Sequence, residues 1–303
     1  MIFLGSSAFA VPSLQAVAEL GFHPLVITKP DKPARRGQKL TGTALKEKAE
    51  ELQLSLLQPV SLKEPELVEA MKKENPELII SIAYGGYIPP EILDIPKLGT
   101  INLHPSLLPK YRGAAPVERA LMAGEVKTGV TLAYVSPEWD AGDVLAQIDC
   151  AINPEDDAGT LLAKLAEAGA SLLKKQLPLI LDGKAVAHPQ DHPKATMAPK
   201  IAESETWIDW QRPAQELVNQ VRGLSPHRAV QTRFRDKLLK IYKAAVVPVQ
   251  GTPGFVAAVT PEGPAVAAKK EAVLLLKVKP ENRKEMSGRD FVNGYAIEEN
   301  KRF

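Results

Sequence analysis

The fold class is decided by Glu77-Leu78-Ile79-Ile80-Ser81-Ile82-Ala83-Tyr84, a stretch that is almost continuously apolar. Such runs are typical of parallel strands buried on both faces of a sheet. Working outward, short apolar runs at residues 1–5, 23–28, 54–58 and 99–104 alternate with segments that have helical spacing of apolar residues. This alternation predicts an α/β domain with a Rossmann-like, mainly parallel open sheet and helices on both faces.

Helices are expected where apolar residues recur every three or four positions. These segments are residues 12–20, 43–52, 63–74, 116–123 and 160–181. Between the last two helices, residues 130–135 and 144–152 are expected to pair as an antiparallel extension of the sheet.

The character of the chain changes after residue 188. Residues 189–206 are polar, rich in proline and weakly periodic, as expected of a linker. Several short strand-like runs follow, separated by proline and glycine, with helices at about 214–221 and 288–293. We therefore predict three parts: a catalytic domain at 1–188, a linker at 189–206, and a small OB-like β-barrel domain at 207–303.

Composition and missing motifs exclude several classes of protein. The chain is 45% hydrophobic and 24% charged, as in ordinary globular proteins, and no apolar run approaches the about 18–20 residues that span a bilayer. Cys150 is the single cysteine, so we expect neither a disulfide framework nor a cysteine-based zinc site. A glycine-rich dinucleotide fingerprint does not follow the first strand, and a phosphate-binding P-loop motif is absent. These features favour a cytoplasmic, metal-free enzyme, which we expect to be monomeric.

The net charge of +2 hides an asymmetry between the two parts of the chain. Residues 207–303 hold 17 Lys and Arg against 10 Asp and Glu, whereas residues 1–206 hold 21 against 26. A further basic segment lies at residues 29–40. Basic surfaces of this kind suit a polyanionic partner such as a nucleic acid, although a solvated surface would also explain them.

Asn102 and His104 are the first candidate catalytic residues. Residues two apart on a strand point to the same face, and both stand where the 99–104 strand ends in a Pro-broken loop. Open α/β sheets keep their ligand sites at such strand ends. The Asp140-Ala141-Gly142-Asp143 run supplies carboxylates, of which Asp140 is favoured over Asp143. An amide, an imidazole and a carboxylate can carry out acyl transfer without a metal. By position alone, a strand-end cap at Asn102 and a hydrogen-bonded core histidine at His104 would be the favoured interpretations.

The motif Asn102-Leu103-His104-Pro105-Ser106-Leu107-Leu108-Pro109-Lys110-Tyr111-Arg112-Gly113-Ala114-Ala115-Pro116 resembles that of the 10-formyltetrahydrofolate-dependent formyltransferase family. Support is spread along the chain, from Phe3-Leu4-Gly5 to Trp207-Ile208-Asp209-Trp210. The resemblance implies transfer of a formyl group from 10-formyltetrahydrofolate to the α-amino group of methionine on initiator methionyl-tRNA, for translation initiation.

Formyl transfer from a tertiary to a primary amine passes through a tetrahedral oxyanion. Such a reaction needs donors for the oxyanion and groups that move protons. We expect the Asn102 amide and His104 to stabilise the oxyanion. We expect Asp140 to hold the imidazole tautomer and to take a proton from the attacking amine.

Binding residues follow from the resemblance and from loop chemistry. The resemblance implies that the Ser106-Leu107-Leu108-Pro109 loop contacts the folate, and Tyr84 and Ile88 are further candidate walls of that pocket. The basic loop, with Arg35, Arg36 and Lys39, is expected to reach the acceptor end of the tRNA. In the C-terminal domain, Arg233, Arg235 and Lys237 are expected to share one strand face as a basic stripe.

Two alternative functions stay open at this point. One is a formyltransferase or hydrolase that uses the same donor but a small acceptor, such as a nucleotide sugar or glycinamide ribonucleotide. The other is a non-enzymatic RNA-binding module. The basic loop and the β-domain argue against the first, and the complete Asn102, His104 and Asp140 set argues against the second.

Overall fold

The computed structural model describes residues 1–33 and 40–303, which form two compact units. Each unit is assembled from separate stretches of the chain. The first comprises residues 1–113, 127–151 and 162–197, and the second comprises residues 114–126, 152–161 and 198–303. The boundaries at 188 and 206 that we derived from composition stay a prediction.

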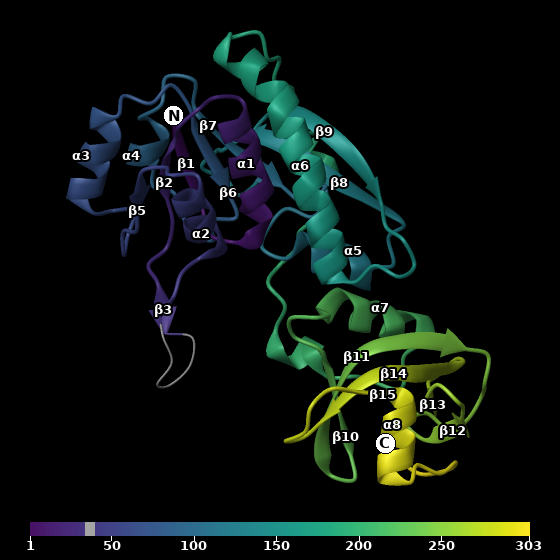
Figure 1. Ribbon diagram of the computed structural model, residues 1–303. Helices are drawn as coiled ribbons and strands as arrows, with labels where there is room; N and C mark the ends of the chain where they lie inside the picture. Colours follow the sequence, from purple (N-terminus) through teal and green to yellow (C-terminus); the bar gives the residue numbers. More distant parts are fainter. Residues whose placement is uncertain (34–39) are drawn as a thin grey trace. The chain divides into compact units, whose positions relative to one another are not determined.

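The first unit is built on a seven-stranded sheet with the order β5-β2-β1-β6-β7-β8-β9 (Figure 1). The first five strands in this order pair in parallel, and the last two pair antiparallel with their neighbours. The prediction of a mainly parallel sheet with an antiparallel extension is therefore confirmed. The strands are β1 Ile2–Gly5, β2 Leu25–Ile27, β5 Leu56–Leu57, β6 Ile79–Ile82, β7 Thr100–His104, β8 Lys127–Tyr134 and β9 Val144–Ala151.

The strand order places the candidate site where open α/β sheets bind ligands, at the carboxyl ends of the strands. The chain proceeds from β1 outward to β2 and β5, and then returns to the other side of β1 with β6 and β7. Ligands in open α/β sheets bind beyond the carboxyl ends of the strands near such a reversal. His104 is the last residue of β7, so its side chain lies at this edge.

Helices cover both faces of the sheet. On the face that carries Ile2, Leu4 and Ile79, the packing partners come from α3 Pro65–Lys73 and from α4 Pro90–Leu93, a single turn that we did not predict. On the opposite face, α6 Ala158–Leu181 approaches β7 so closely that a Cβ on Gly169 would come within 2.3 Å of Leu103.

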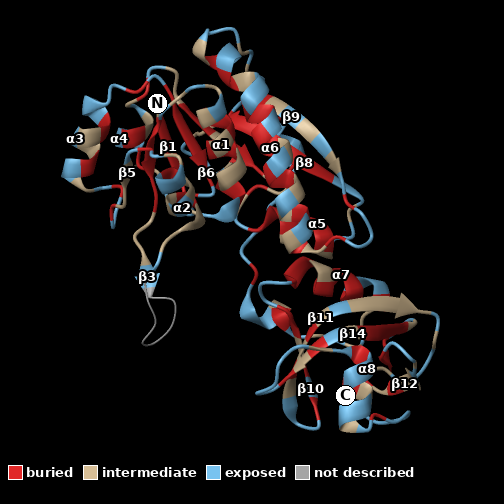
Figure 2. Ribbon diagram, in the orientation of Figure 1, coloured by how far each residue is buried: buried red, intermediate tan, exposed pale blue. Residues whose placement is uncertain are grey.

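α1 Val11–Glu19 lies beside α6, and an ion pair of 2.7 Å between Glu19 and Lys174 joins the two helices (Figure 1). α2 Ala44–Glu51 contributes Leu45, which lies against Gly5 at the end of β1. Figure 2 shows the result: the strands are mostly buried and the outer faces of the helices are exposed.

The basic segment of the first unit includes a short antiparallel pair of strands, β3 Lys32–Pro33 and β4 Leu40–Thr41. The base of this ladder is fixed by the Asp31 carboxylate, which accepts from Lys46 Nζ (2.6 Å) and from Gln58 Nε2 (2.7 Å). Arg35, Arg36 and Lys39, for which we expect tRNA contacts, lie outside the described residues.

The second unit contains an antiparallel sheet with the order β10-β11-β14-β13-β12, and β15 pairs with β14. The prediction of a C-terminal β-domain is confirmed, and the named strands of this sheet pair antiparallel, whereas its closure into an OB-like barrel stays a prediction. The elements are β10 Val230–Phe234, β11 Lys237–Val247, β12 Val256–Val259, β13 Pro264–Ala267, β14 Ala272–Pro280, β15 Met286–Ser287, α5 Pro116–Met122, α7 Ala214–Leu224 and α8 Gly288–Tyr295. Short 3-10 turns at η1 Ala8–Ala10, η2 His192–Lys194 and η3 Glu203–Thr206 complete the chain.

Aromatic side chains hold α8 against this sheet. The ring of Phe234 lies 5.2 Å from Phe291 and 5.0 Å from Phe303, and Phe291 lies 4.9 Å from Tyr295. Aromatic pairs at these separations add to the burial of their apolar surface. Phe291 is fully buried in the same cluster as Leu217 and Val221 of α7.

The predicted basic stripe of Arg233, Arg235 and Lys237 is wrong as a single strand face. The chain reverses between β10 and β11, and Arg235 and Asp236 form the turn with φ of +50° and +62°. Arg233 lies on β10 opposite Leu238, whereas Lys237 lies on β11 opposite Phe234. Neighbouring pairs in a ladder point to opposite faces, so Arg233 and Lys237 point away from each other.

An ion pair in the second unit predicts how stability depends on pH. Arg119 of α5 donates from Nη1 and Nη2 to the Glu205 carboxylate (2.5 and 2.9 Å), and the Ala202 N–H donates to the same group (2.9 Å). These bonds lower the pKa of Glu205 from 4.5 to about 2. Between these values the unfolded chain binds more protons, so this contribution is full above pH 4.5 and is lost as the pH falls towards 2.

We therefore expect Glu205→Gln to flatten the fall in Tm between pH 4.5 and pH 2, as measured by thermal unfolding across this range. Glu203→Gln, at an exposed position in the same 3-10 turn, is the matched control and should keep the wild-type slope. Equal slopes for wild type and Glu205→Gln would contradict the assignment.

Within the described ranges, no helix is long and apolar enough to cross a membrane.

Candidate active site

Three residues that we predicted from the sequence come together at the carboxyl end of β7. Asp140 Oδ2 lies 3.6 Å from His104 Nδ1, and Asp140 Oδ1 lies 3.5 Å from Asn102 Nδ2. The side chains of His104 and Asp140 are 5% and 13% exposed, so the two groups interact with little screening by water. Contacts of this length commonly tighten only when substrate binds.

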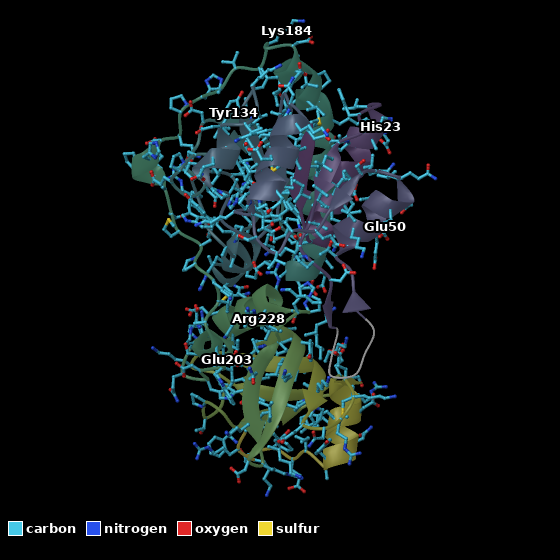
Figure 3. The ribbon with its side chains drawn as sticks, turned by 90° about the vertical axis from the view of Figure 1, so that its left-hand side faces the viewer. His23, Glu50, Tyr134, Lys184, Glu203 and Arg228 are labelled. Atoms are coloured by element: carbon cyan, nitrogen blue, oxygen red, sulfur yellow. The ribbon has the colours of Figure 1, made fainter. Side chains whose placement is uncertain are left out.

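The register of the sheet explains why Asn102 and His104 face the same way. Asn102 pairs with Ala133 and His104 pairs with Thr131, so Thr131 of β8 shares their face. Tyr134, labelled in Figure 3, ends β8 opposite Ile101, and the chain then turns through residues 135–143 to enter β9. This turn carries Asp140 back to the end of β7.

The orientation of the His104 ring is set by a backbone group. His104 Nε2 lies 2.9 Å from the carbonyl oxygen of Tyr111. A carbonyl only accepts hydrogen bonds, so Nε2 must carry the proton and Nδ1 faces Asp140. The Tyr111 carbonyl orients the ring at Nε2 and Asp140 faces Nδ1 on the other side, so our expectation that Asp140 holds the tautomer stays a prediction.

Asp140 is held by a strained backbone and by a backbone donor. Its φ is +51°, a left-handed conformation that is uncommon for residues other than glycine. The Gly113 N–H donates to Oδ2 at 2.8 Å. Only glycine fits at position 142, because a Cβ there would lie 1.9 Å from the Tyr134 carbonyl oxygen. Asp143 is exposed, and its carbonyl accepts from the Tyr134 N–H, so it supports the turn.

The Ser106–Pro109 region of the predicted folate loop is anchored on the same face of the sheet. Thr131 Oγ1 donates to the Ser106 carbonyl (2.7 Å) and accepts from the Leu108 N–H (3.0 Å). Gln147 Nε2 donates to the Leu108 carbonyl at 2.8 Å. Leu107 is packed over Gly129, where a Cβ would lie 2.5 Å from it. The loop is therefore anchored to β8 and β9 through its main-chain groups.

The other two predicted folate contacts lie after β6. Tyr84 is 7% exposed in the cluster of Ile2 and Leu4, and burial raises the pKa of its hydroxyl. Ile88 packs against the same cluster. Lys29 Nζ donates to the Gly85 carbonyl at 2.7 Å, which ties the base of the basic segment to this loop. Folate contact by Tyr84 and Ile88 stays a prediction.

The basic residues predicted in the second unit lie against aromatic rings. The guanidinium of Arg233 stands 5.8 Å from the Trp207 ring, and that of Arg235 stands 4.9 Å from the Phe234 ring. Lys237 is exposed at the start of β11. Their contact with tRNA stays a prediction.

Two functional groups of this site have no signal in the sequence. They are main-chain groups, the carbonyl of Tyr111 and the N–H of Gly113, which have no side-chain signature. Among the described residues, no cluster of histidine, cysteine and acidic side chains could hold a metal ion.

The chain matches two family models over most of its length. The model described as "Formyl transferase" matches residues 2–177, and the model described as "Formyl transferase, C-terminal domain" matches residues 200–296. Among solved structures, an N-formyltransferase from Helicobacter canadensis with folinic acid and dTDP-3-aminofucose has a TM-score of 0.70 at 20% identity, covering 93% of this chain and 100% of that one. HypX from Aquifex aeolicus with tetrahydrofolic acid has a TM-score of 0.66 at 20% identity, and this chain spans 47% of its length. At this identity the likeness shows the fold.

Curated relatives are about twice as similar in sequence to this chain as these structures. The methionyl-tRNA formyltransferase of Bacillus subtilis (strain 168) is 39% identical over 302 residues, covering 98% of this chain and 95% of that protein. The methionyl-tRNA formyltransferase of Moorella thermoacetica is 42% identical over 300 residues, covering 98% of this chain and 96% of that protein. The chain belongs to the methionyl-tRNA formyltransferase family.

Proposed function

We propose that this chain transfers the formyl group of 10-formyltetrahydrofolate to the α-amino group of methionine on initiator methionyl-tRNA. The observation that supports it best is the meeting of Asn102, His104 and Asp140 at the carboxyl end of β7. The set combines an amide donor, an imidazole and a carboxylate, which suit a carbonyl that becomes an oxyanion and an amine that loses a proton.

Each side chain has a distinct task in this proposal. Asn102 donates from Nδ2 to the oxygen of the formyl group as negative charge develops there. His104, held at Nε2 by the Tyr111 carbonyl, presents Nδ1 to the reacting groups and shares in that charge when protonated. Asp140, held by the Gly113 N–H, takes the proton of the attacking amine directly or through water, and His104 relays a proton to the folate nitrogen as its bond to the formyl carbon breaks.

The formyl donor is proposed to bind beside the loop at Ser106, Leu107, Leu108 and Pro109. Leu108 and Pro109 also line a cavity of about 350 Å³ that continues along Val144, Gln147 and residues 188–191. Cavities of this size are at the lower end of those that take small ligands. The anchored loop, together with the chemistry of the three catalytic side chains, fits a folate donor without a metal.

The acceptor is proposed to be engaged by the basic segment with Arg35, Arg36 and Lys39 and by Arg233, Arg235 and Lys237. The second unit supports this because its basic side chains lie against aromatic rings, an arrangement that suits contacts with phosphates and bases. The first unit supplies all three catalytic side chains from one copy of the chain, and we propose a cytoplasmic monomer.

A direct assay tests the choice of acceptor. The protein is incubated with 10-formyltetrahydrofolate and charged initiator methionyl-tRNA, and formylmethionine is measured. Parallel reactions contain a nucleotide-linked amino sugar or glycinamide ribonucleotide in place of the tRNA. We expect a formylated product in the reaction with the tRNA and none in the reactions with the small amines. Product with a small amine and none with the tRNA would replace the proposal with that of a small-acceptor formyltransferase.

Salt should separate the two substrates in the same assay. Contacts between basic side chains and phosphates weaken steeply as salt rises, because bound counterions are released on association. We therefore expect KM for the tRNA to rise strongly with potassium chloride while KM for 10-formyltetrahydrofolate stays nearly constant. Equal responses of the two constants would contradict recognition of the tRNA through basic surfaces.

A further inference from the structure

Residues 188–197 form a strap across the two loops that carry the catalytic groups. His188 exchanges two backbone hydrogen bonds with Val144, at 2.8 and 2.9 Å, just after the Asp140 turn. At the other end of the strap, Thr196 accepts from the Arg112 N–H through its carbonyl (2.9 Å) and from the Tyr111 N–H through Oγ1 (2.9 Å). The strap thus fixes the loop that sets the His104 ring and the turn that carries Asp140.

Gln190 joins the strap to the backbone on both sides of Ala141. It is 7% exposed, and its Nε2 donates to the Asp140 carbonyl at 2.9 Å and to the Gly142 carbonyl at 2.7 Å. Carbonyl oxygens only accept, so the nitrogen end of the amide must face them. A single NH₂ group therefore holds the peptide group that follows Asp140 and the one that follows Gly142, which fixes the path of the turn directly after the Asp140 side chain.

Arg112 holds the opposite end of the same amide. Its Nε and Nη2 donate to Gln190 Oε1 at 3.1 and 2.7 Å, and Arg112 is 4% exposed. Nη2 also lies 3.1 Å from His192 Nδ1. A guanidinium only donates, so the oxygen end of the Gln190 amide must face it. The orientation of the amide is fixed by chemistry at both ends.

The two carbonyl bonds stabilise the left-handed backbone of Asp140, whose φ is +51°. Such conformations persist where their surroundings over-determine them. The Gly113 N–H fixes the carboxylate from one side, and Gln190 fixes the peptide groups from the other. A change at Gln190 would move the carboxylate relative to His104 Nδ1 without removing any group that touches substrate.

We propose that Gln190 is a positioning residue for formyl transfer, acting through the backbone of Asp140 and Gly142, with Arg112 setting the orientation of its amide. This inference rests on the proposed function, because it takes Asp140 as the group that accepts the proton. Misplacement of a reacting group by about 1 Å can cost about 10²-fold in rate, which sets the size of the expected defect.

Gln190→Glu is the sharpest test. The substitution keeps the shape and the bonds to Arg112, but it turns a second oxygen towards two carbonyl oxygens and repels them. We expect kcat to fall by about 10–10²-fold, while KM for 10-formyltetrahydrofolate and for methionyl-tRNA changes by less than about twofold. If Gln190 only ties the strap to Arg112, a glutamate would serve equally well and kcat would be retained, which would overturn the proposal.

Gln190→Met covers the case in which a buried carboxylate disturbs folding. It adds no charge and removes the carbonyl bonds, so the same loss of kcat is expected. Full kcat in this variant overturns the proposal. Global unfolding of both variants, seen by circular dichroism, would assign Gln190 to folding and would overturn it as well.

The second unit offers a matched control. Gln220 of α7 is 3% exposed, and its Nε2 donates to the carbonyls of Glu205 (2.8 Å) and Trp207 (3.1 Å). Gln220→Glu makes the same chemical change at another side-chain amide that donates to two backbone carbonyls. We therefore expect a lower Tm and an unchanged kcat. An equal loss of kcat here would show that the effect is not specific to Gln190. The formylation of methionyl-tRNA by the unmodified protein, measured in the same series, tests the proposed function separately. That measurement does not depend on any variant.

Discussion

Replacing Asp140 with asparagine is expected to lower kcat for formyl transfer by about 10²–10⁴-fold, the usual contribution of a positioned acid or base. The volume is unchanged, and the remaining side-chain oxygen can still accept from the Gly113 N–H. The charge beside His104 Nδ1 and the ability to accept a proton are both lost. Steady-state kinetics with methionyl-tRNA, together with a thermal unfolding curve, measures the effect.

Asp143→Asn is the control for this variant. Asp143 belongs to the same Asp-Ala-Gly-Asp run, but its side chain is exposed and its structural contribution is the carbonyl that accepts from the Tyr134 N–H. We expect Asp143→Asn to retain wild-type kcat. Equal losses at positions 140 and 143 would show that charge in this turn matters in general, and would contradict the assignment of Asp140 as the proton acceptor.

Replacing Asn102 with alanine is expected to lower kcat by about 10²–10³-fold, the cost of removing one oxyanion donor. The amide contributes to the transition state and little to the ground state, so KM for both substrates should change much less than kcat. Asn102 is half-buried at the end of β7, and the truncation removes few contacts. A loss confined to KM would indicate a binding role instead.

Thr100→Val is the control on the same strand and the same sheet face. Thr100 is 3% exposed, and no hydrogen-bond partner for its Oγ1 exists in the part of the chain that the structure describes. Exchanging an unpaired buried hydroxyl for a methyl group is neutral or stabilising. We expect unchanged kcat and an equal or higher Tm, which would show that the Asn102 effect does not come from disturbing β7.

The sheet could be predicted because its pattern is local. The apolar run around Ile80 and the helical spacing of α1, α2, α3 and α6 each identify an element without knowledge of the rest. Asn102 and His104 could be paired for the same reason, since two positions on one strand share a face. The short α4 and β15 escaped prediction because four and two residues carry no periodicity.

Contacts between distant segments could not be predicted in the same way. Asp140 is 38 residues from Asn102 in sequence, and the Asp-Ala-Gly-Asp run singled it out as a carboxylate without showing that it reaches the end of β7. The Tyr111 carbonyl has no side-chain signal at all. Gln190 lies among prolines that we assigned to a linker, so its burial beneath the catalytic turn became visible only in the fold. The prediction of one basic strand face that includes Arg233 was wrong because the chain reverses direction at the turn formed by Arg235 and Asp236.

The β3–β4 ladder makes the basic segment modular. Lys32 pairs with Thr41 and Pro33 pairs with Leu40, so the two ends of the insert are held side by side. Residues between these pairs can be lengthened or exchanged without moving a strand of the seven-stranded sheet, and each doubling of loop length costs only about 0.6 kcal/mol. Under the proposed function, changes in this insert would alter one of the two acceptor-binding surfaces, while the catalytic side chains at the end of β7 stay unchanged.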